Sequence, residues 1–136
     1  MSAAADTIGV VLCDDVPELR MLLRFGLEES DDLRVVGEAG DATTGVAIVT
    51  ETQPDAVLLD LSMPGMDGLQ AIPLIQRASP DTAIIVFSAF AADRMSRSAL
   101  EQGADRYVEK GAPLQDVRAI VREEVGARRG SSTQDG

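Results

Sequence analysis

The sequence predicts a doubly wound α/β fold, in which five helices cover a five-stranded parallel sheet. The first observation is a set of short, continuous apolar runs, which are typical of strands buried on both faces. The strands are expected at residues 8–12, 33–36, 56–59, 82–87 and 107–108. The second observation is that a helical segment follows each run. Because strands and helices alternate, right-handed crossovers would place helices on both faces of the sheet.

The expected helices have recognisable ends. They begin at Pro17, after Asp41, near Leu69, before Met95 and at Pro113. Asp41 is a good N-cap, proline is tolerated in a first turn, and Gly103 is a natural end for the fourth helix. Gly26 is a weak point in the first helix, and Pro73 either lies in the first turn of the third helix or kinks it. Each predicted strand is therefore followed by one helix.

The length of 136 residues fits one packed domain, because a single core usually forms within ~100–150 residues. We expect this domain to span residues 7–125. Residues 126–136 have a loop composition without an apolar pattern, which predicts a flexible C-terminal tail or the start of a linker.

Charge and cysteine content exclude several classes of protein. The net charge of −11 argues against direct binding to nucleic acid or to an anionic membrane, since both require local positive charge. Cys13 is the only cysteine, so no internal disulfide can form. The N-terminus has no basic region, and no apolar run approaches the roughly 18 residues that span a bilayer. We therefore expect a cytoplasmic protein whose partners are other proteins.

Polar residues follow four of the predicted strands. Asp14 and Asp15 come after the first run, Asp60 after the third, Ser88 after the fourth and Lys110 after the fifth. The carboxyl ends of parallel strands meet at one edge of a sheet, where such folds bind ligands. The sequence contains neither glycine-rich motif of nucleotide-binding proteins. Three carboxylates held together repel one another, and a hard divalent cation such as Mg²⁺ relieves this repulsion through oxygen ligands.

Such a cluster has the parts needed to transfer a phosphoryl group onto an aspartate. An ionised aspartate needs no general base, which agrees with a chain that has no histidine. Mg²⁺ would screen the approach of the anionic phosphoryl group. Lys110 would supply a point charge and Ser88 a hydroxyl donor. Every other cationic side chain is an arginine, and a site that requires a compact ammonium would explain the exception.

At these positions the sequence resembles the receiver domains of bacterial two-component response regulators, over roughly residues 7–125. The matching segments are Asp14-Asp15, DLSMPGMDG from Asp60 to Gly68, Ser88, Tyr107 and Lys110. The resemblance implies a CheY-like, flavodoxin-like fold and a phosphorylated signalling protein that catalyses only its own phosphorylation and slow dephosphorylation. Glu109 to Ala112 and Ala91 to Arg94 look most like receivers of the DNA-binding NarL/LuxR-type branch, although no output domain is expected within this chain.

The resemblance also implies the roles of the acidic residues and the lysine. Asp60 would accept the phosphoryl group from a sensor histidine kinase or a phosphotransfer protein. Asp15 and Asp60, with the backbone carbonyl of Ser62, would bind Mg²⁺, while Asp14 would hold a metal-bound water. Lys110 would pair with the phosphoryl group.

Ser88 and Tyr107 would form the conformational switch by the same resemblance. Phosphorylation would draw Ser88 toward the new oxygens and let Tyr107 turn inward, and Phe90 would shield the phosphoryl group from water. Two positions depart from the family pattern. Gly111 replaces a frequent proline, which favours a trans peptide, and Ser88 replaces the usual threonine, which loses a rotamer-restricting methyl group.

Several alternatives remain open at this point. Asp15 with Glu18 also fits a capping box for the first helix, and Asp67-Gly68 is more simply a turn. The downstream target is either a protein partner or a lost output domain, and a phosphorylation-dependent homodimer is allowed. A constitutive interaction module that dimerises without phosphorylation is the alternative function. An aspartate-nucleophile phosphatase is disfavoured, because Ser62 stands where such an enzyme needs a second acid.

Overall fold

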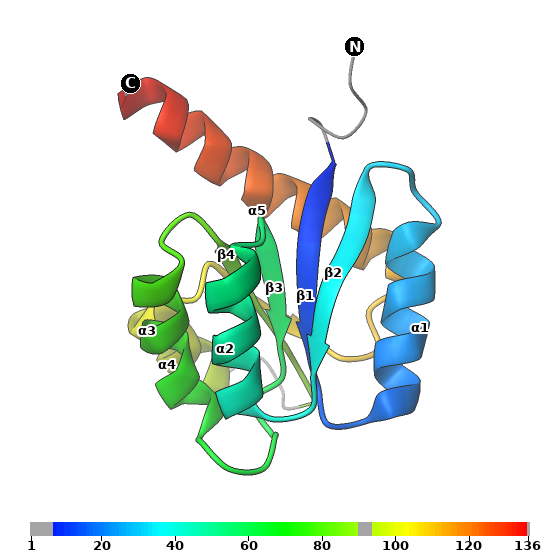
Figure 1. Ribbon diagram of the computed structural model, residues 1–136, viewed down its shortest axis with the longest axis vertical. Coiled ribbons are helices and arrows are strands. Elements are labelled where there is room, and N and C mark those ends of the chain that lie inside the picture. The colour runs from blue at the N-terminus through cyan, green and yellow to red at the C-terminus, as the bar shows by residue number, and fades with distance from the viewer. Residues whose placement is uncertain (1–6, 90–93, 136) are drawn as a thin grey trace.

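The computed structural model describes residues 7–89 and 94–135. Its strands are β1 (Ile8–Cys13), β2 (Leu33–Ala39), β3 (Ala56–Leu59), β4 (Ala83–Ser88) and β5 (Arg106–Glu109). Its helices are α1 (Pro17–Glu28), α2 (Ala42–Thr52), α3 (Gly68–Ala78), α4 (Arg94–Gln102) and α5 (Leu114–Asp135). The strands form one parallel sheet in the order β2-β1-β3-β4-β5 (Figure 1). The predicted fold class is confirmed.

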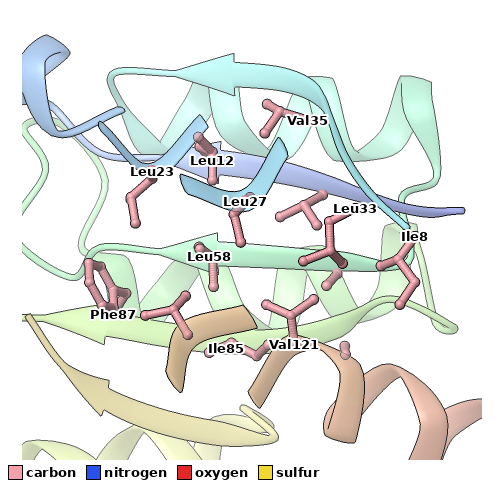
Figure 2. Packing of buried hydrophobic residues seen from close by; sticks show 14 of the residues in the cluster. Ile8, Leu12, Leu23, Leu27, Leu33, Val35, Leu58, Ile85, Phe87 and Val121 are labelled. Carbon is pink, nitrogen blue, oxygen red and sulfur yellow. The ribbon is translucent and has the colours of Figure 1, made fainter. Parts of the chain in front are cut away.

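The sheet separates two apolar clusters, as expected for strands buried on both faces. Alternate residues of β1 point to opposite sides, so that Val10 and Leu12 pack with α1 and α5, while Val11 and Cys13 pack with α2, α3 and α4. Figure 2 shows the first cluster, in which Leu27 lies over the sheet near Leu58. Each large aliphatic side chain buried in this way contributes about 1.5–3 kcal/mol to stability. The strand ends are thereby held in fixed positions.

Strand β2 extends three residues beyond the predicted end at Val36, to Ala39. The apolar run stops at Gly37, so the apolar pattern gave no sign that the strand continues to Ala39. At that position a Cβ atom would lie 2.6 Å from the Ile48 side chain of α2, so glycine allows the helix to approach the strand. The register shifts between Val10 and Val11 of the neighbouring β1, as in a β-bulge.

Two predicted helix features are refined by the structure. Asp41 caps α2, because its carboxylate accepts a hydrogen bond from the Thr44 amide at 2.8 Å. Pro73 lies inside α3, beyond the first turn. Gly26 is a packing position more than a weak point, since a Cβ atom there would lie 2.5 Å from the Leu114 side chain. Helices α1 and α5 can therefore meet closely on their side of the sheet.

Helix α5 continues to Asp135, whereas the sequence predicted loop structure from Gly126 onward. The last turns project past the amino ends of the strands in Figure 1. Arg128 binds both carboxylate oxygens of Asp105, at 3.0 and 2.9 Å, and Arg129 lies 3.3 Å from a carboxylate oxygen of Asp55. These contacts are polar, so an apolar pattern could not reveal them. The domain boundary at residue 125 stays a prediction.

Among residues 7–89 and 94–135, none of the helices combines the length and the apolar composition needed to cross a membrane.

Candidate functional site

The polar residues predicted from the sequence meet at the carboxyl edge of the sheet. Backbone hydrogen bonds continue beyond the strand ends and fix these positions. The Asp60 amide donates to the Cys13 carbonyl at 2.9 Å, and the Lys110 amide donates to the Ser88 carbonyl at 2.7 Å. Each residue is thus held by the neighbouring strand. The sheet brings together side chains that are up to 96 positions apart, as for Asp14 and Lys110.

Lys110 contacts two buried carboxylates at once. Its Nζ lies 2.7 Å from Asp14 Oδ2 and 3.2 Å from Asp60 Oδ2. Asp14 and Asp60 are only 2% and 1% exposed. Burial raises the pKa of Asp60, and the nearby Asp14 adds to this effect, against the lowering by the Ser62 amide and by Lys110. Burial would lower the pKa of Lys110, but its bond to Asp14 and the charges of both aspartates raise it. The lysine is therefore charged at neutral pH.

Asp15 lies beside this pair but is exposed to solvent. It does not form the capping box that the sequence allowed, because the N-cap of α1 is Val16 and no side chain caps the helix. The turn is closed instead by Asp14, whose Oδ1 accepts a hydrogen bond from the Val16 amide at 2.9 Å. The Asp15 carboxylate consequently remains available at the mouth of the site.

The three aspartates satisfy the donor requirements of a hard divalent cation. One carboxylate oxygen from each of Asp14, Asp15 and Asp60 lies within 4.8 Å of the others. Lys110 is the one cation that contacts the two buried carboxylates in the part of the chain that the structure describes. Three carboxylates facing one ammonium leave an excess of negative charge, and Mg²⁺ or Ca²⁺ prefers such oxygen ligands. The cluster can therefore hold a metal ion.

The loop after β3 is anchored around Ser62. Leu61 and Met63 are buried on either side of it, and the Ser62 amide donates to Asp60 Oδ1 at 3.1 Å. Gly68 lies so close to the Leu61 backbone that a Cβ atom would approach within 2.6 Å. Asp67 caps α3 through the Leu69 amide at 3.0 Å, which agrees with a structural turn at Asp67-Gly68. The Ser62 backbone is thus held next to the acidic cluster.

Ser88 and Tyr107 lie on neighbouring strands and share one face of the sheet. Ser88 ends β4 and is fully buried. Tyr107 pairs with Val86 in the β4–β5 register and is half-buried against the cluster that packs under α2, α3 and α4. Residues two apart on a strand point to the same side, so Tyr107 lies one diagonal step from Ser88. Phe90, predicted to shield the site, lies outside the described residues.

Sequence reasoning missed Arg20, which also belongs to this edge. Its guanidinium donates to the backbone carbonyl of Asp14 and to Glu38. In the sequence of α1, Arg20 has apolar neighbours on both sides. An arginine in an amphipathic helix normally lies on the solvent-exposed face, so nothing in this pattern indicated a specific contact. Its spacing from Asp14 carried no recognised motif. The contact depends on the fold, which brings the Asp14 carbonyl within reach of a side chain in the first turns of α1.

Gly111 follows the lysine with a positive φ of +102°, and the Lys110–Gly111 peptide is trans, as predicted. Proline cannot adopt this φ. We expect Gly111→Ala to lower the free energy of unfolding by about 1 kcal/mol, because an L-residue is strained there. Urea denaturation would measure the change.

Gly126→Ala is the matched control for this prediction. A Cβ atom meets nothing within 4 Å at either glycine, but Gly126 lies within α5. Alanine there should stabilise the protein by up to roughly 1 kcal/mol. Equal effects of the two variants would show that the backbone at Gly111 is not strained.

A model of the response regulator receiver domain matches residues 10–122 of the chain. The transcriptional regulatory protein LiaR of Bacillus subtilis is 38% identical over 115 residues, which cover 85% of this chain and 54% of LiaR. The nitrate/nitrite response regulator protein NarL of Escherichia coli K12 is 35% identical over 108 residues, covering 79% of this chain and 50% of NarL. The chain therefore spans about half the length of the curated relatives it matches.

Solved structures agree with this assignment. A two-component response regulator of the LuxR family from Aurantimonas sp. SI85-9A1 superimposes with a TM-score of 0.77 and 29% identity, covering 90% of this chain and 98% of that one. The response regulator domain of Thermotoga maritima CheB gives a TM-score of 0.81 at 25% identity, with 88% and 97% covered. Because the family model matches most of the chain, the chain belongs to the response regulator receiver domain family.

Proposed function

We propose that this receiver accepts a phosphoryl group on Asp60 in a Mg²⁺-dependent reaction and changes conformation in response. The observation that supports this most strongly is the contact of one ammonium, Lys110, with both buried carboxylates of an acidic cluster. The carboxylate of Asp60 is buried and has a raised pKa, and the Asp60 backbone is held by a hydrogen bond to the neighbouring strand. These properties suit a nucleophile more than a surface carboxylate.

The neighbouring residues divide the remaining tasks. Asp15, Asp60 and the Ser62 carbonyl would hold the metal ion, and Asp14 would orient a metal-bound water. When bound, the ion neutralises charge on the incoming phosphoryl oxygens. Lys110 exchanges its contact with Asp60 for one with a phosphoryl oxygen. Asp60 attacks the phosphorus atom while the bond to the donor breaks, so that an aspartyl phosphate forms and the donor leaves with the bonding electrons.

Ser88 and Tyr107 would pass the change on to the surface. A phosphoryl group at Asp60 would add acceptor oxygens at the carboxyl edge of the sheet, where the buried Ser88 ends β4. Movement of Ser88 toward those oxygens opens space on the sheet face that Tyr107 shares, and inward rotation of Tyr107 alters the surface of α4, β5 and α5. The matched segments cover only 54% of LiaR and 50% of NarL, so both regulators are longer than this chain. Control of a linked or separate output is therefore the proposed consequence of phosphorylation.

The reaction is tested by incubating the protein with acetyl phosphate and measuring its intact mass. The expected result is a single phosphoryl adduct that needs Mg²⁺, disappears with EDTA, and maps to Asp60 by tandem mass spectrometry. An adduct on another residue would contradict the assignment of Asp60. No adduct in folded protein would favour a constitutive interaction module that works without phosphorylation.

The donor is proposed to be a histidine kinase that docks on the exposed apolar side of α1. Met21, Leu22 and Phe25 are 70%, 52% and 69% exposed on this helix, which begins at the acidic edge of the sheet. Isolated apolar residues are common on surfaces, but three on one helix beside a reactive site favour an interface.

Phe25→Glu should therefore slow transfer from a cognate kinase by at least about tenfold, the scale of losing one well-packed interface aromatic. Its reaction with acetyl phosphate should not change, because Phe25 does not contact the acidic cluster. Leu100→Glu, at a 47% exposed position of α4, serves as the control. Equal slowing by both variants in the kinase assay would remove α1 as the docking surface.

A further inference from the structure

We propose that Arg20 is a positioning residue, which holds the Asp14 carbonyl and thereby sets the direction of the Asp15 carboxylate toward the metal. The inference rests on the proposed function, because it assigns a task within the same acidic cluster. Arg20 lies on α1, six positions after Asp14, and its side chain is 20% exposed. It does not contact any of the three carboxylates that would bind the ion, so its effect must pass through the backbone.

The guanidinium of Arg20 joins three parts of the chain. One terminal nitrogen donates to the backbone carbonyl of Asp14, at the end of β1. Its Nε donates to Glu38 Oε1 of β2 at 3.1 Å. The other oxygen of Glu38 accepts from Arg24, one helical turn further along α1, at 2.8 Å. The Glu38 carboxylate, which accepts from both Arg20 and Arg24, therefore holds the planar guanidinium of Arg20 in place.

Two hydrogen bonds hold the turn at Asp14 and Asp15, where α1 has no side-chain cap: the Asp14 carboxylate accepts from the Val16 amide, and the Asp14 carbonyl accepts from Arg20. Pro17 lacks an amide proton, and the first backbone bonds of the helix run from Leu19 and Arg20 to the Val16 carbonyl. Within the described part of the chain, no hydrogen bond or ion pair restrains the Asp15 side chain. Its direction is then set by its own backbone and by rotamer preference.

Arg20 controls that backbone directly. The Asp14 carbonyl and the Asp15 amide belong to one planar peptide unit. A donor that fixes the carbonyl oxygen therefore fixes the orientation of the Asp15 amide and of the bond to its Cβ atom. The Asp14 side chain is held separately, by the Val16 amide and by Lys110. Loss of Arg20 should consequently affect Asp15 far more than Asp14.

The charge of Arg20 is compensated within the same group of residues. Its nearest anion is Glu38, so the guanidinium is neutralised on the side of β2 and does not replace the ion at the acidic cluster. Lys110 supplies the positive charge that faces the phosphoryl group, whereas Arg20 fixes the orientation of the peptide between Asp14 and Asp15. A lysine at position 20 would have one compact ammonium in place of a fork that reaches two acceptors.

The test is a Mg²⁺ titration of the unphosphorylated protein, followed by amide NMR shifts. Loss of a residue that orients a metal ligand typically weakens affinity by roughly 10–100-fold. Arg20→Met should therefore raise the Mg²⁺ dissociation constant by at least about tenfold, and Arg20→Lys by a smaller factor. At saturating Mg²⁺, the rate of phosphorylation by acetyl phosphate should return to within about threefold of wild type, since the reacting groups are intact.

Arg24→Met is the matched control, because Arg24 binds the same Glu38 but does not contact Asp14. Its Mg²⁺ affinity should stay within about twofold of wild type. Equal affinities of Arg20→Met and Arg24→Met would overturn the inference. If Arg20→Met does not fold, Arg20→Lys decides, and a wild-type affinity in that variant overturns it as well. Wild-type protein that neither binds Mg²⁺ nor forms an adduct would contradict the proposed function instead.

Discussion

Asp60→Asn is expected to abolish phosphorylation by acetyl phosphate and, without metal, to make the fold more stable. The amide cannot act as the nucleophile, so no adduct should form. Ionised Asp60 is almost fully buried, and its attraction to Lys110 is opposed by repulsion from Asp14. Desolvation is then the uncompensated cost. Removing that charge should raise the free energy of unfolding on the order of 1 kcal/mol, the free energy of one pKa unit.

The gain in stability should depend on pH in a defined direction. The pKa of Asp60 is raised above its ordinary value of 3.8 in the folded protein. Above 3.8, the folded state therefore binds more protons at this site than the unfolded state, and stability falls as the pH rises toward and through the folded pKa. Asp60→Asn removes this fall in stability with rising pH. The variant should exceed wild type at pH 7 and lose its advantage below about pH 4.

Urea unfolding in EDTA at both pH values measures the effect. Asp67→Asn is the control, because it removes a carboxylate that only caps α3 and asparagine caps equally well. Its stability should remain within about 0.5 kcal/mol of wild type. A wild-type stability for Asp60→Asn at pH 7 would mean that Lys110 fully compensates the buried charge.

The sequence could locate the acidic edge because strand topology converts distant positions into neighbours. Asp60 and Lys110 are 50 residues apart, but each follows an apolar run, and parallel strands end at the same edge. The same reasoning placed Asp14 in the site. It could not choose between capping and metal binding for Asp15, because both depend on where one side chain points. The structure decides against capping, since Val16 is the N-cap.

Polar contacts between elements were beyond the reach of sequence patterns. Arg20 holds the Asp14 carbonyl, and Arg128 holds Asp105 at the opposite edge of the sheet. An arginine on a helix surface has the same local signal whether it binds a distant backbone or solvent. The continuation of α5 was missed for this reason, because ion pairs hold residues that lack an apolar stripe. Apolar periodicity therefore predicted the core and, apart from the longer β2, the approximate strand ends, but not the polar contacts between elements.

Lys110→Met is expected to have the largest combined effect on reactivity and stability. The ammonium that faces the phosphoryl group is lost, and removing one such electrostatic contact typically slows a reaction by about 10²–10³-fold. Asp14 and Asp60 also lose their shared cation. In EDTA the free energy of unfolding should fall by about 3 kcal/mol, the lower end for breaking a buried pair, because Asp60 can take up a proton. Lys110→Arg should not restore the rate, since the forked guanidinium replaces a compact ammonium.

The stability effect of Lys110 should be constant around neutral pH. Its pKa is raised in the folded protein, so its contribution is complete below the ordinary lysine value of 10.5 and is lost as the pH rises through the folded value. Unfolding of the two single variants and of Asp60→Asn/Lys110→Met, in EDTA at pH 7, isolates the interaction. The double variant should be more stable than Lys110→Met alone, because only Asp14 remains unpaired. Additive effects would mean that Lys110 and Asp60 do not interact in the unphosphorylated protein, and the stabilising ion pair of the lysine would then be the one with Asp14.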